Sequence, residues 1–370
     1  MADDLSTPLT GRRRKPAEPR SFPVARILFA LVLLIGGAFI LRILLTDEPD
    51  GGRPSQEVAI TSTRNGNELA STVSTGPVTI TADPQQYPAG TAPAAEAAGE
   101  EPGTAAGLFA TLPDLVEETE LGAIPRMSAS GDTPFSAYLR PADQAAASGQ
   151  PLVSIIMVGL GINEQGSLEA IDQLPEDVTL AFAPYGKSLG NTVAAARQQG
   201  HEVLLEVPLE PFDYPQNDPG PHTLLTGEVP RANLDKLFWL MSRFGGYIGV
   251  INNMGARFTA AAADFSPVME ELGARGLGYV DDGSSNRSVA PQLADGNEVP
   301  YARADLMIDT NPSRTAILEA LASLEAKAVE NGRAMGIVTA LPISIAAISE
   351  WSSALESRGI TLVPASALMQ

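Results

Sequence analysis

The sequence predicts an α/β domain at residues 149–370, built as a deformed (β/α) barrel of about seven strands. Short apolar segments alternate with amphipathic helical stretches, which is the pattern of repeated β-α units. The segments are apolar throughout, as expected for parallel strands that are covered on both faces. The Gly159–Gly161 segment is too short to be a dinucleotide-binding glycine fingerprint, so a barrel is favoured over an open nucleotide-binding sheet.

The individual elements follow from this alternation. Predicted strands, some including the loop that follows, lie at residues 152–161, 178–186, 201–211, 247–258, 277–285, 304–310, 333–341 and 360–368. Predicted helices lie at residues 191–200, 234–244, 265–276, 314–332 and 343–359. Gly200 and Gly276 end two of these helices, because glycine is the usual stop signal after the last helical turn.

Residues 24–45 are predicted to form a transmembrane helix. Fifteen apolar or glycine residues lie between Arg26 and Arg42, and a helix needs roughly 20 residues to cross a hydrocarbon core of about 30 Å. The preceding tail, residues 1–23, is basic, so we expect it in the cytoplasm and the C-terminal domain outside. A cleaved signal peptide is the alternative, but the apolar run is long for one and no small-residue cleavage site follows it.

Residues 46–148 are predicted to be a low-complexity, mostly disordered linker. The stretch is rich in Ala, Gly, Pro, Thr and Glu, a composition that buries little surface and stays extended. It would hold the domain away from the membrane as a stalk. A short apolar patch at residues 124–138 is expected to dock on the edge of the domain.

Charge and cysteine content exclude some functions. The net charge is −20 and lies almost wholly after the apolar run, which does not suit a nucleic-acid partner because phosphate binding needs clustered Lys and Arg. The chain has no cysteine, which rules out thiolate metal sites, cysteine nucleophiles and disulfides. We expect an inner-membrane protein with a periplasmic or otherwise extracytoplasmic domain.

Polar residues follow the predicted strands, and in parallel α/β folds such strand ends form the site. Because the ends meet at one edge of the sheet, we expect one cluster. Its members are Gly159, Asn163, Tyr185, Glu206, Glu210, Asn252, Asn253, Arg257, Asp281, Asp282, Ser284, Asp309 and Thr339.

These strand ends resemble one family, the divergent polysaccharide deacetylases, a branch of the NodB-like deformed barrels. The resemblance runs from about residue 150 to the end of the chain. It is carried by LPEDVTLAFAPYG, GHEVLLEVPLEPFDYPQNDPGPHTLL, GVINNMGARFT, RGLGYVDDGSS, ADLMIDT and RGITLVPASAL.

The resemblance implies a deacetylase that holds a divalent metal with one Asp and two His, and this chain departs from that pattern. The expected aspartate pair after the first strand is Val158 and Gly159 here, and the expected histidines are Glu206 and Asn253. A late Gly-His-Pro strand end is replaced at residues 338–340. Residues that keep the pattern are Glu210, Asn252, Met254, Gly255, Arg257, Asp281, Asp305 and Asp309.

A rearranged catalytic site would use carboxylates. Its candidate catalytic residues are Asp281, Glu206 and Glu210, and its candidate substrate-binding residues are Asn252, Asn253, Arg257, Asp282 and Tyr185. An oxygen-only set including Glu206, Glu210, Asp281 and Asp282 would suit Mg²⁺, Ca²⁺ or Mn²⁺ better than Zn²⁺. Alternatively, Glu210 and Asp281 support the fold through hydrogen bonds to backbone amides and Arg257. We expect no metal ligand and no cofactor, since His201 and His222 are not placed to ligate a metal together.

Three functions follow from these observations. The first is a degenerate deacetylase-like domain that binds a cell-envelope glycan or an envelope protein, because metal-ligand residue types are missing at three strand ends. The second is an active deacetylase or esterase with Glu206 or Asp281 as the base. The third is a structural envelope protein that contacts a neighbouring protein.

Overall fold

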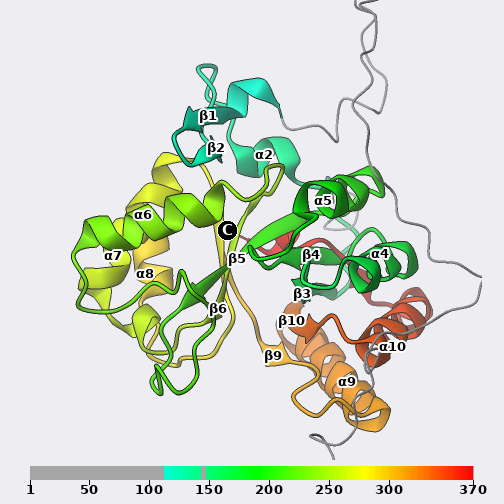
Figure 1. Ribbon diagram of the computed structural model, residues 1–370. Helices are drawn as coiled ribbons and strands as arrows, with labels where there is room; N and C mark the ends of the chain where they lie inside the picture. The colour runs from blue at the N-terminus through cyan, green and yellow to red at the C-terminus, as the bar shows by residue number, and fades with distance from the viewer. Residues whose placement is uncertain (1–111, 143–146, 370) are drawn as a thin grey trace, which may run out of the picture. The chain divides into compact units, whose positions relative to one another are not determined.

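In the computed structural model, residues 112–142 and 147–369 are described (Figure 1). The strands are β1 (Val116–Thr119), β2 (Gly122–Pro125), β3 (Leu152–Leu160), β4 (Thr179–Phe182), β5 (Val203–Leu209), β6 (Gly249–Met254), β7 (Gly278–Asp281), β8 (Tyr301–Arg303), β9 (Leu306–Met307), β10 (Arg333–Thr339) and β11 (Thr361–Leu362). The α-helices are α2 (Pro134–Tyr138), α4 (Glu164–Gln173), α5 (Leu189–Gln198), α6 (Pro230–Met241), α7 (Ala262–Ala274), α8 (Ala290–Gly296), α9 (Arg314–Asn331) and α10 (Pro342–Ser352).

Within these residues, β3 to β11 form one nine-stranded sheet in which all pairs are parallel. The hydrogen-bonded order is β8-β7-β6-β5-β4-β3-β10-β9, and β11 pairs with the start of β3. The helices that connect the strands lie outside the curled sheet (Figure 1). The predicted class, an α/β fold with a deformed parallel barrel, is therefore confirmed, with short additional strands beyond the expected seven.

The curled sheet has a seam between its two end strands. β8 pairs with β7, and β9 pairs with β10 on the other side of the barrel. Ala304 and Asp305 connect β8 to β9. The Ala304 amide donates to Asp281 O of β7 at 2.9 Å, and the Asp305 amide donates to Met335 O of β10 at 2.8 Å. A single stretch of chain thus passes from one edge of the sheet to the other. The two edges are joined here by a continuous backbone segment and not by a strand ladder, so the sheet is a half-barrel.

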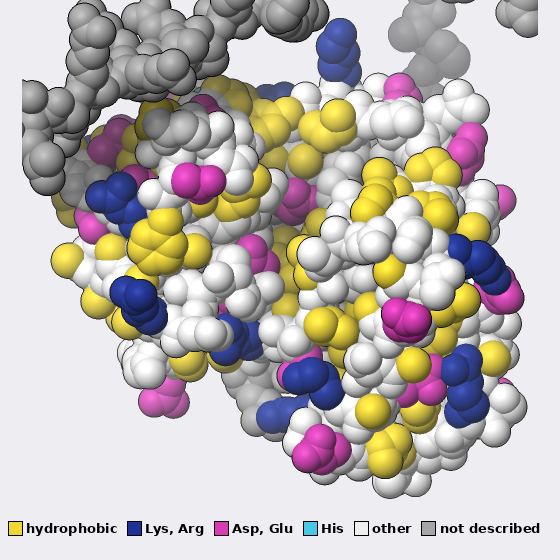
Figure 2. Space-filling model, turned by 90° about the horizontal axis from the view of Figure 1, so that it is seen from below, with side chains coloured by type: hydrophobic (Ala, Val, Ile, Leu, Met, Phe, Trp, Pro, Cys, Tyr) yellow, Lys and Arg dark blue, Asp and Glu magenta, His cyan; other side chains and the backbone are white. Residues whose placement is uncertain are grey.

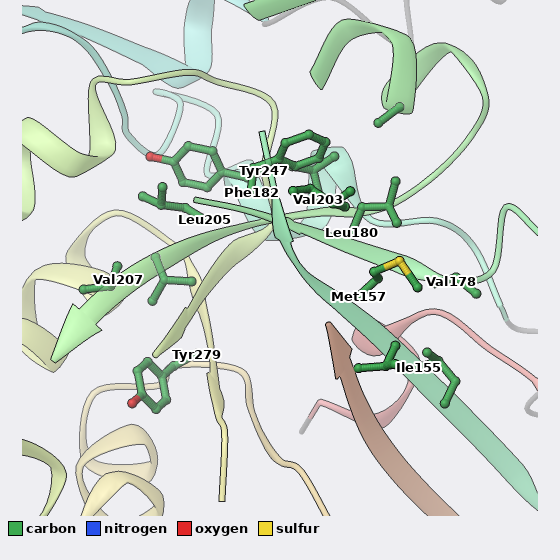
Figure 3. Packing of buried hydrophobic residues seen from close by; sticks show 14 of the residues in the cluster. Ile155, Met157, Val178, Leu180, Phe182, Val203, Leu205, Val207, Tyr247 and Tyr279 are labelled. Atoms are coloured by element: carbon green, nitrogen blue, oxygen red, sulfur yellow. The ribbon is translucent and has the colours of Figure 1, made fainter. Parts of the chain in front are cut away.

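Two hydrophobic clusters form on the two faces of the sheet. The outer cluster lies between the strands and the helices and includes the side chains drawn in Figure 3, such as Met157, Phe182 and Tyr279. The inner cluster fills the curl of the sheet and includes Ile156 and Leu204. Because successive side chains of a strand point to opposite faces, each strand contributes to both clusters. This explains why the strand segments are apolar throughout.

Residues 112–142 fall inside the predicted linker, yet they form a hairpin of β1 and β2 followed by α2. Ile124 and Tyr138 are only 2% and 4% exposed, and the Phe135 amide donates to Gly276 O at 3.1 Å. These contacts put the expected apolar patch on the domain. The packed region accordingly starts ahead of the boundary predicted at residue 149, because low-complexity composition ends before Leu115.

Other elements also differ from the prediction. Helices α4 and α8 and strand β8 were not predicted, and the predicted strand at residues 304–310 contains only the two-residue β9. The helix stop at Gly200 is confirmed by its positive φ of 89°.

Nothing in residues 112–142 and 147–369 is a helix both long and apolar enough to cross a membrane. The predicted transmembrane segment, residues 24–45, lies outside the described residues, as does most of the predicted linker.

The face drawn in Figure 2 carries acidic, basic and hydrophobic side chains intermixed.

The close approach of β6 and β7 generates a stability prediction. Gly249 and Gly278 are register partners, and a Cβ added at Gly249 would lie 2.2 Å from the Gly278 carbonyl oxygen. We expect Gly249→Ala to lower the free energy of unfolding by about 2 kcal/mol or more, because backbone cannot move aside as a side chain can. Denaturant unfolding measures this change.

Gly190→Ala is the matched control. Gly190 lies in α5 and a Cβ there would meet nothing within 4 Å, so this variant should gain up to about 1 kcal/mol from higher helix propensity. Equal stability of Gly249→Ala and the wild type would contradict the packing described for β6 and β7.

Candidate functional site

A groove of about 510 Å³ opens at the carboxyl ends of β3, β5, β6 and β10, a size typical of small-ligand sites. Ile251 and Ile337, from the inner cluster, form part of its wall. The other lining residues are Val158, Gly159, Glu206, Pro211, Asn217, Asn252, Asn253, Met254, Gly255, Ala256, Asp282, Ser284, Met307 and Thr339.

The groove continues the inner face of the sheet. Glu206 follows the buried Leu204 by two residues, and Asn253 follows Ile251 in the same way, so each pair points to one face. The same spacing relates Val158 to Ile156, Asp282 to Val280 and Thr339 to Ile337. The inner face therefore changes from an apolar layer to a mainly polar layer at the strand ends.

Glu206 is the most strongly perturbed group in the groove. Its side chain comes from β5 and the residue is only 4% exposed. One carboxyl oxygen accepts a hydrogen bond from the Gly159 amide of β3, and the other lies 3.5 Å from Asn253 Nδ2. Burial raises the pKa of Glu206 to about 7, and the Gly159 hydrogen bond opposes this only in part. A carboxyl group with such a pKa can both take up and release a proton near neutral pH.

Asn252 holds the loops on one side of the groove. Its Oδ1 accepts hydrogen bonds from the Asp282 amide and the Tyr279 hydroxyl, both at 2.9 Å, and its Nδ2 donates to Met254 O. Met254 has a φ of 62°, a left-handed conformation that is uncommon for a residue with a side chain. Burial raises the pKa of Asp282, and the charge of neighbouring Asp281 adds to the effect.

Asp309 holds the opposite side. It is 7% exposed, and Oδ2 accepts from the Thr339 amide at 3.0 Å and from the Ser344 hydroxyl at 2.8 Å. Ser344 lies in the first turn of α10, where a carboxylate also complements the helix dipole. Asp309 thereby fixes the end of β10, which carries Thr339 into the groove.

The predicted site residues divide into two groups. Glu206, Asn252, Asn253 and Asp282 line the groove, whereas Glu210, Arg257, Asp281 and Tyr185 do not.

The side chain of Glu210 is occupied by structural contacts. It accepts from the Thr226 amide and hydroxyl and forms an ion pair with Arg257 at 3.0 Å. Glu210 and Arg257 thus tie the loop after β5 to the loop after β6. This arrangement matches the alternative given above, in which Glu210 supports the fold through hydrogen bonds to a backbone amide and an ion pair with Arg257.

Asp281 lies on the face of β7 opposite to Asp282. It shares that outer face with Tyr279, and its Oδ1 accepts from the Gly283 amide at 2.8 Å. Asp281 therefore does not line the groove that Asp282 lines, because side chains alternate along a strand. Tyr185 packs instead beside Trp239, with ring centroids 6.2 Å apart.

The groove does not fit the metal that the family resemblance implies. His201 is fully buried near the start of β5, where its Nδ1 lies 2.9 Å from Val178 O. His222 stacks on Trp239 with ring centroids 3.6 Å apart. Neither histidine lines the groove. Across the part of the chain that the structure describes, no three His, Cys, Asp or Glu side chains are grouped so as to hold a metal ion.

The groove also has lining residues outside the predicted cluster, and Pro211, Asn217 and Met307 are three of them. Pro211 and Asn217 come from the long loop after β5, and Met307 comes from β9 at the seam. Local sequence patterns do not identify these residues as groove residues. Pro211 and Asn217 reach the groove only through the path of the folded loop, and Met307 through the position of the short strand β9.

A solved structure of a related protein supports this fold. An uncharacterized protein of Agrobacterium tumefaciens C58 has a solved structure that superposes with a TM-score of 0.64 at 42% identity, covering 67% of this chain and 99% of that one. The catalytic domain of a peptidoglycan N-acetylglucosamine deacetylase from Eubacterium rectale superposes with a TM-score of 0.39 at 15% identity, covering 60% and 93%.

The fold is thus that of a curled parallel α/β half-barrel with its groove at the carboxyl ends of the strands. Residues 155–369 match the divergent polysaccharide deacetylase family, and the chain belongs to it. It is also 22% identical over 197 residues to the uncharacterized protein YibQ of Escherichia coli K12, spanning 53% of this chain and 60% of YibQ.

The buried carboxyl group generates a prediction about pH and stability. Because the folded-state pKa of Glu206 is raised from 4.5 to about 7, the folded protein binds this proton more tightly than the unfolded chain. Its stabilising effect is complete below pH 4.5 and is lost as the pH rises to about 7. Glu206→Gln keeps a neutral group, so it should exceed the wild type in unfolding free energy by about 3 kcal/mol at pH 8 and by less than about 1 kcal/mol at pH 5.

Denaturant unfolding at both pH values provides the measurement. Glu330→Gln makes the same chemical change at an exposed position of α9 and should track the wild type throughout. A difference between Glu206→Gln and the wild type that did not grow with pH would show that burial does not perturb this carboxyl group.

The contacts of Asp309 generate a second prediction. Asp309→Ala leaves the Thr339 amide and the Ser344 hydroxyl without their acceptor, so we expect a loss of about 2–4 kcal/mol in unfolding free energy. Asp172→Ala, at an exposed position of α4, should change it by less than about 0.5 kcal/mol. Similar effects of the two substitutions would refute the role given to Asp309.

Proposed function

We propose that this protein is a membrane-anchored, envelope-facing member of its family whose groove binds a cell-envelope glycan without the metal chemistry of a deacetylase. The supporting observation is that this chain has a groove at the strand ends, where the family resemblance implies a metal site, but lacks the residue types that would hold the metal. Four of the replaced positions, Val158, Gly159, Glu206 and Asn253, line the same groove, together with Thr339. Four positions that meet in space are a stronger sign of altered chemistry than four isolated changes.

The framework around the groove supports a binding role. Asn252 and Asp309 each hold a wall of the groove through several hydrogen bonds. Carboxamide, carboxyl and hydroxyl groups line the groove, alongside apolar side chains such as Met307 and Ile337. Sugars present hydroxyl groups and apolar ring faces, so this mixture of surfaces suits them.

The proposed location rests on the sequence. The apolar segment at residues 24–45, with a basic tail before it, would anchor the chain with the domain outside the cytoplasm. In this arrangement the folded domain faces the cell envelope, where a glycan is available as a ligand.

Glu206 favours a second candidate, an active deacetylase or esterase with a rearranged site. A buried carboxyl group with a pKa of about 7 is suited to act as a general base on a water molecule near neutral pH. Gly159 orients this carboxyl group through its amide. In this candidate, Glu206 would take a proton from the water that attacks the acetyl carbonyl.

A binding and acetate-release assay separates the two candidates. The full-length protein in mild detergent should bind peptidoglycan fragments or chito-oligosaccharides and release no acetate, with or without a chelator. Asn253→Ala should weaken binding about tenfold, because it removes a polar contact in the groove. Isothermal titration calorimetry and an acetate assay give these quantities.

Asn331→Ala is the control, since Asn331 ends α9 away from the groove residues and its loss should leave binding unchanged. Acetate release that disappears in Glu206→Gln would favour the second candidate over the first. Failure of all these glycans to bind would contradict the proposed function.

A further inference from the structure

The groove carries carboxyl groups and no cationic side chain among its described lining residues. Its lining includes two carboxyl groups, Glu206 and Asp282, and the carboxamides of Asn217 and Asn253. The Asn252 carboxamide is occupied by its own hydrogen bonds. No Lys, Arg or His is among the described residues that line it. A positively charged ligand group would therefore meet complementary charge there and no competing cation.

Nearby arginines point to other partners. Arg257, in the loop after β6, forms its ion pair with Glu210. Arg303, in β8, donates to Gly283 O, to Ser285 O at 3.1 Å and to Asn286 Oδ1. Neither side chain is available to neutralise the groove from within.

Glu206 has an oxygen that is poorly satisfied. One oxygen accepts from the Gly159 amide, but the other has only the 3.5 Å approach of Asn253 Nδ2. The residue is 4% exposed, so water compensates its charge poorly, and burial raises its pKa to about 7. A buried carboxylate without a full set of partners is costly unless a cation pairs with it.

We infer that the groove recognises a protonated primary amine and that its ligand is an amino sugar whose nitrogen is not acetylated, with Glu206 pairing to the ammonium group. This inference rests on the proposed glycan-binding function and specifies its ligand.

The chemistry of the two forms of the sugar supports this choice. An ammonium group donates three hydrogen bonds and carries the positive charge that would pair with the Glu206 carboxylate. An N-acetyl group has one N–H donor and no charge, so it cannot form an ion pair with the carboxyl groups of the groove. Discrimination therefore comes from the ion pair that only the free amine can form.

The test compares two matched oligosaccharides, a glucosamine tetramer and an N-acetylglucosamine tetramer. Full-length protein in mild detergent is titrated with each at pH 7 by isothermal titration calorimetry. We expect the glucosamine tetramer to bind at least about tenfold more tightly. Because a polycation is attracted to any acidic protein, the comparison is repeated at about 0.5 M salt, which screens surface charges more than a buried pair.

Two variants show where the preference arises. Glu206→Gln should reduce the preference to near equality, whereas Glu330→Gln, which removes one charge from an exposed helical position, should retain it. Equal binding of both tetramers by the wild type would overturn the inference and leave the proposed glycan binding in place. A preference unchanged in Glu206→Gln would also overturn it. Loss of all binding to both tetramers would contradict the inference together with the proposed function.

Discussion

The Glu206–Gly159 hydrogen bond is the contact around which the groove is organised. It links β5 to β3, although β4 lies between these strands in the sheet. In the layer directly below, the inward side chain of β4 is Ala181, the register partner of Leu204. A small side chain therefore lies beneath the path along which Glu206 reaches toward β3. A carboxyl group thereby lies at the boundary between the apolar interior and the groove, and its raised pKa follows from that position.

The same boundary explains how a scaffold can keep a site while the chemistry of the site changes. The layer below, with Leu204 and Ile251, packs the barrel and stabilises it. The layer above, with Glu206 and Asn253, contributes less to packing and can vary as long as its polar groups find partners. Asn252 and Asp309 hold the walls from outside this layer, so the shape of the groove does not depend on metal ligands.

Much of the fold could be predicted from the sequence, because apolar strands and glycine-terminated helices leave strong local signals. The seam between β8 and β9 could not, since its strands are two or three residues long. The strand ends pointed to Glu206, Asn252, Asn253 and Asp282, and these four residues line the groove. The sequence alone did not show which of Asp281 and Asp282 faces the groove. A one-residue shift along the strand exchanges the faces that the two side chains take. The role of Asn217 depends on the path of a long loop, which local sequence patterns do not specify.

A direct titration of Glu206 tests the central claim that the groove contains a buried, incompletely paired carboxyl group. Carboxyl carbons can be labelled with ¹³C in the side chains of glutamate, and the Glu206 resonance assigned by its absence in Glu206→Gln. Its chemical shift, followed by NMR across the pH range, should report a pKa of about 7. A pKa at or below the ordinary value of 4.5 would show that the carboxyl group is solvated or already paired, and would contradict the account.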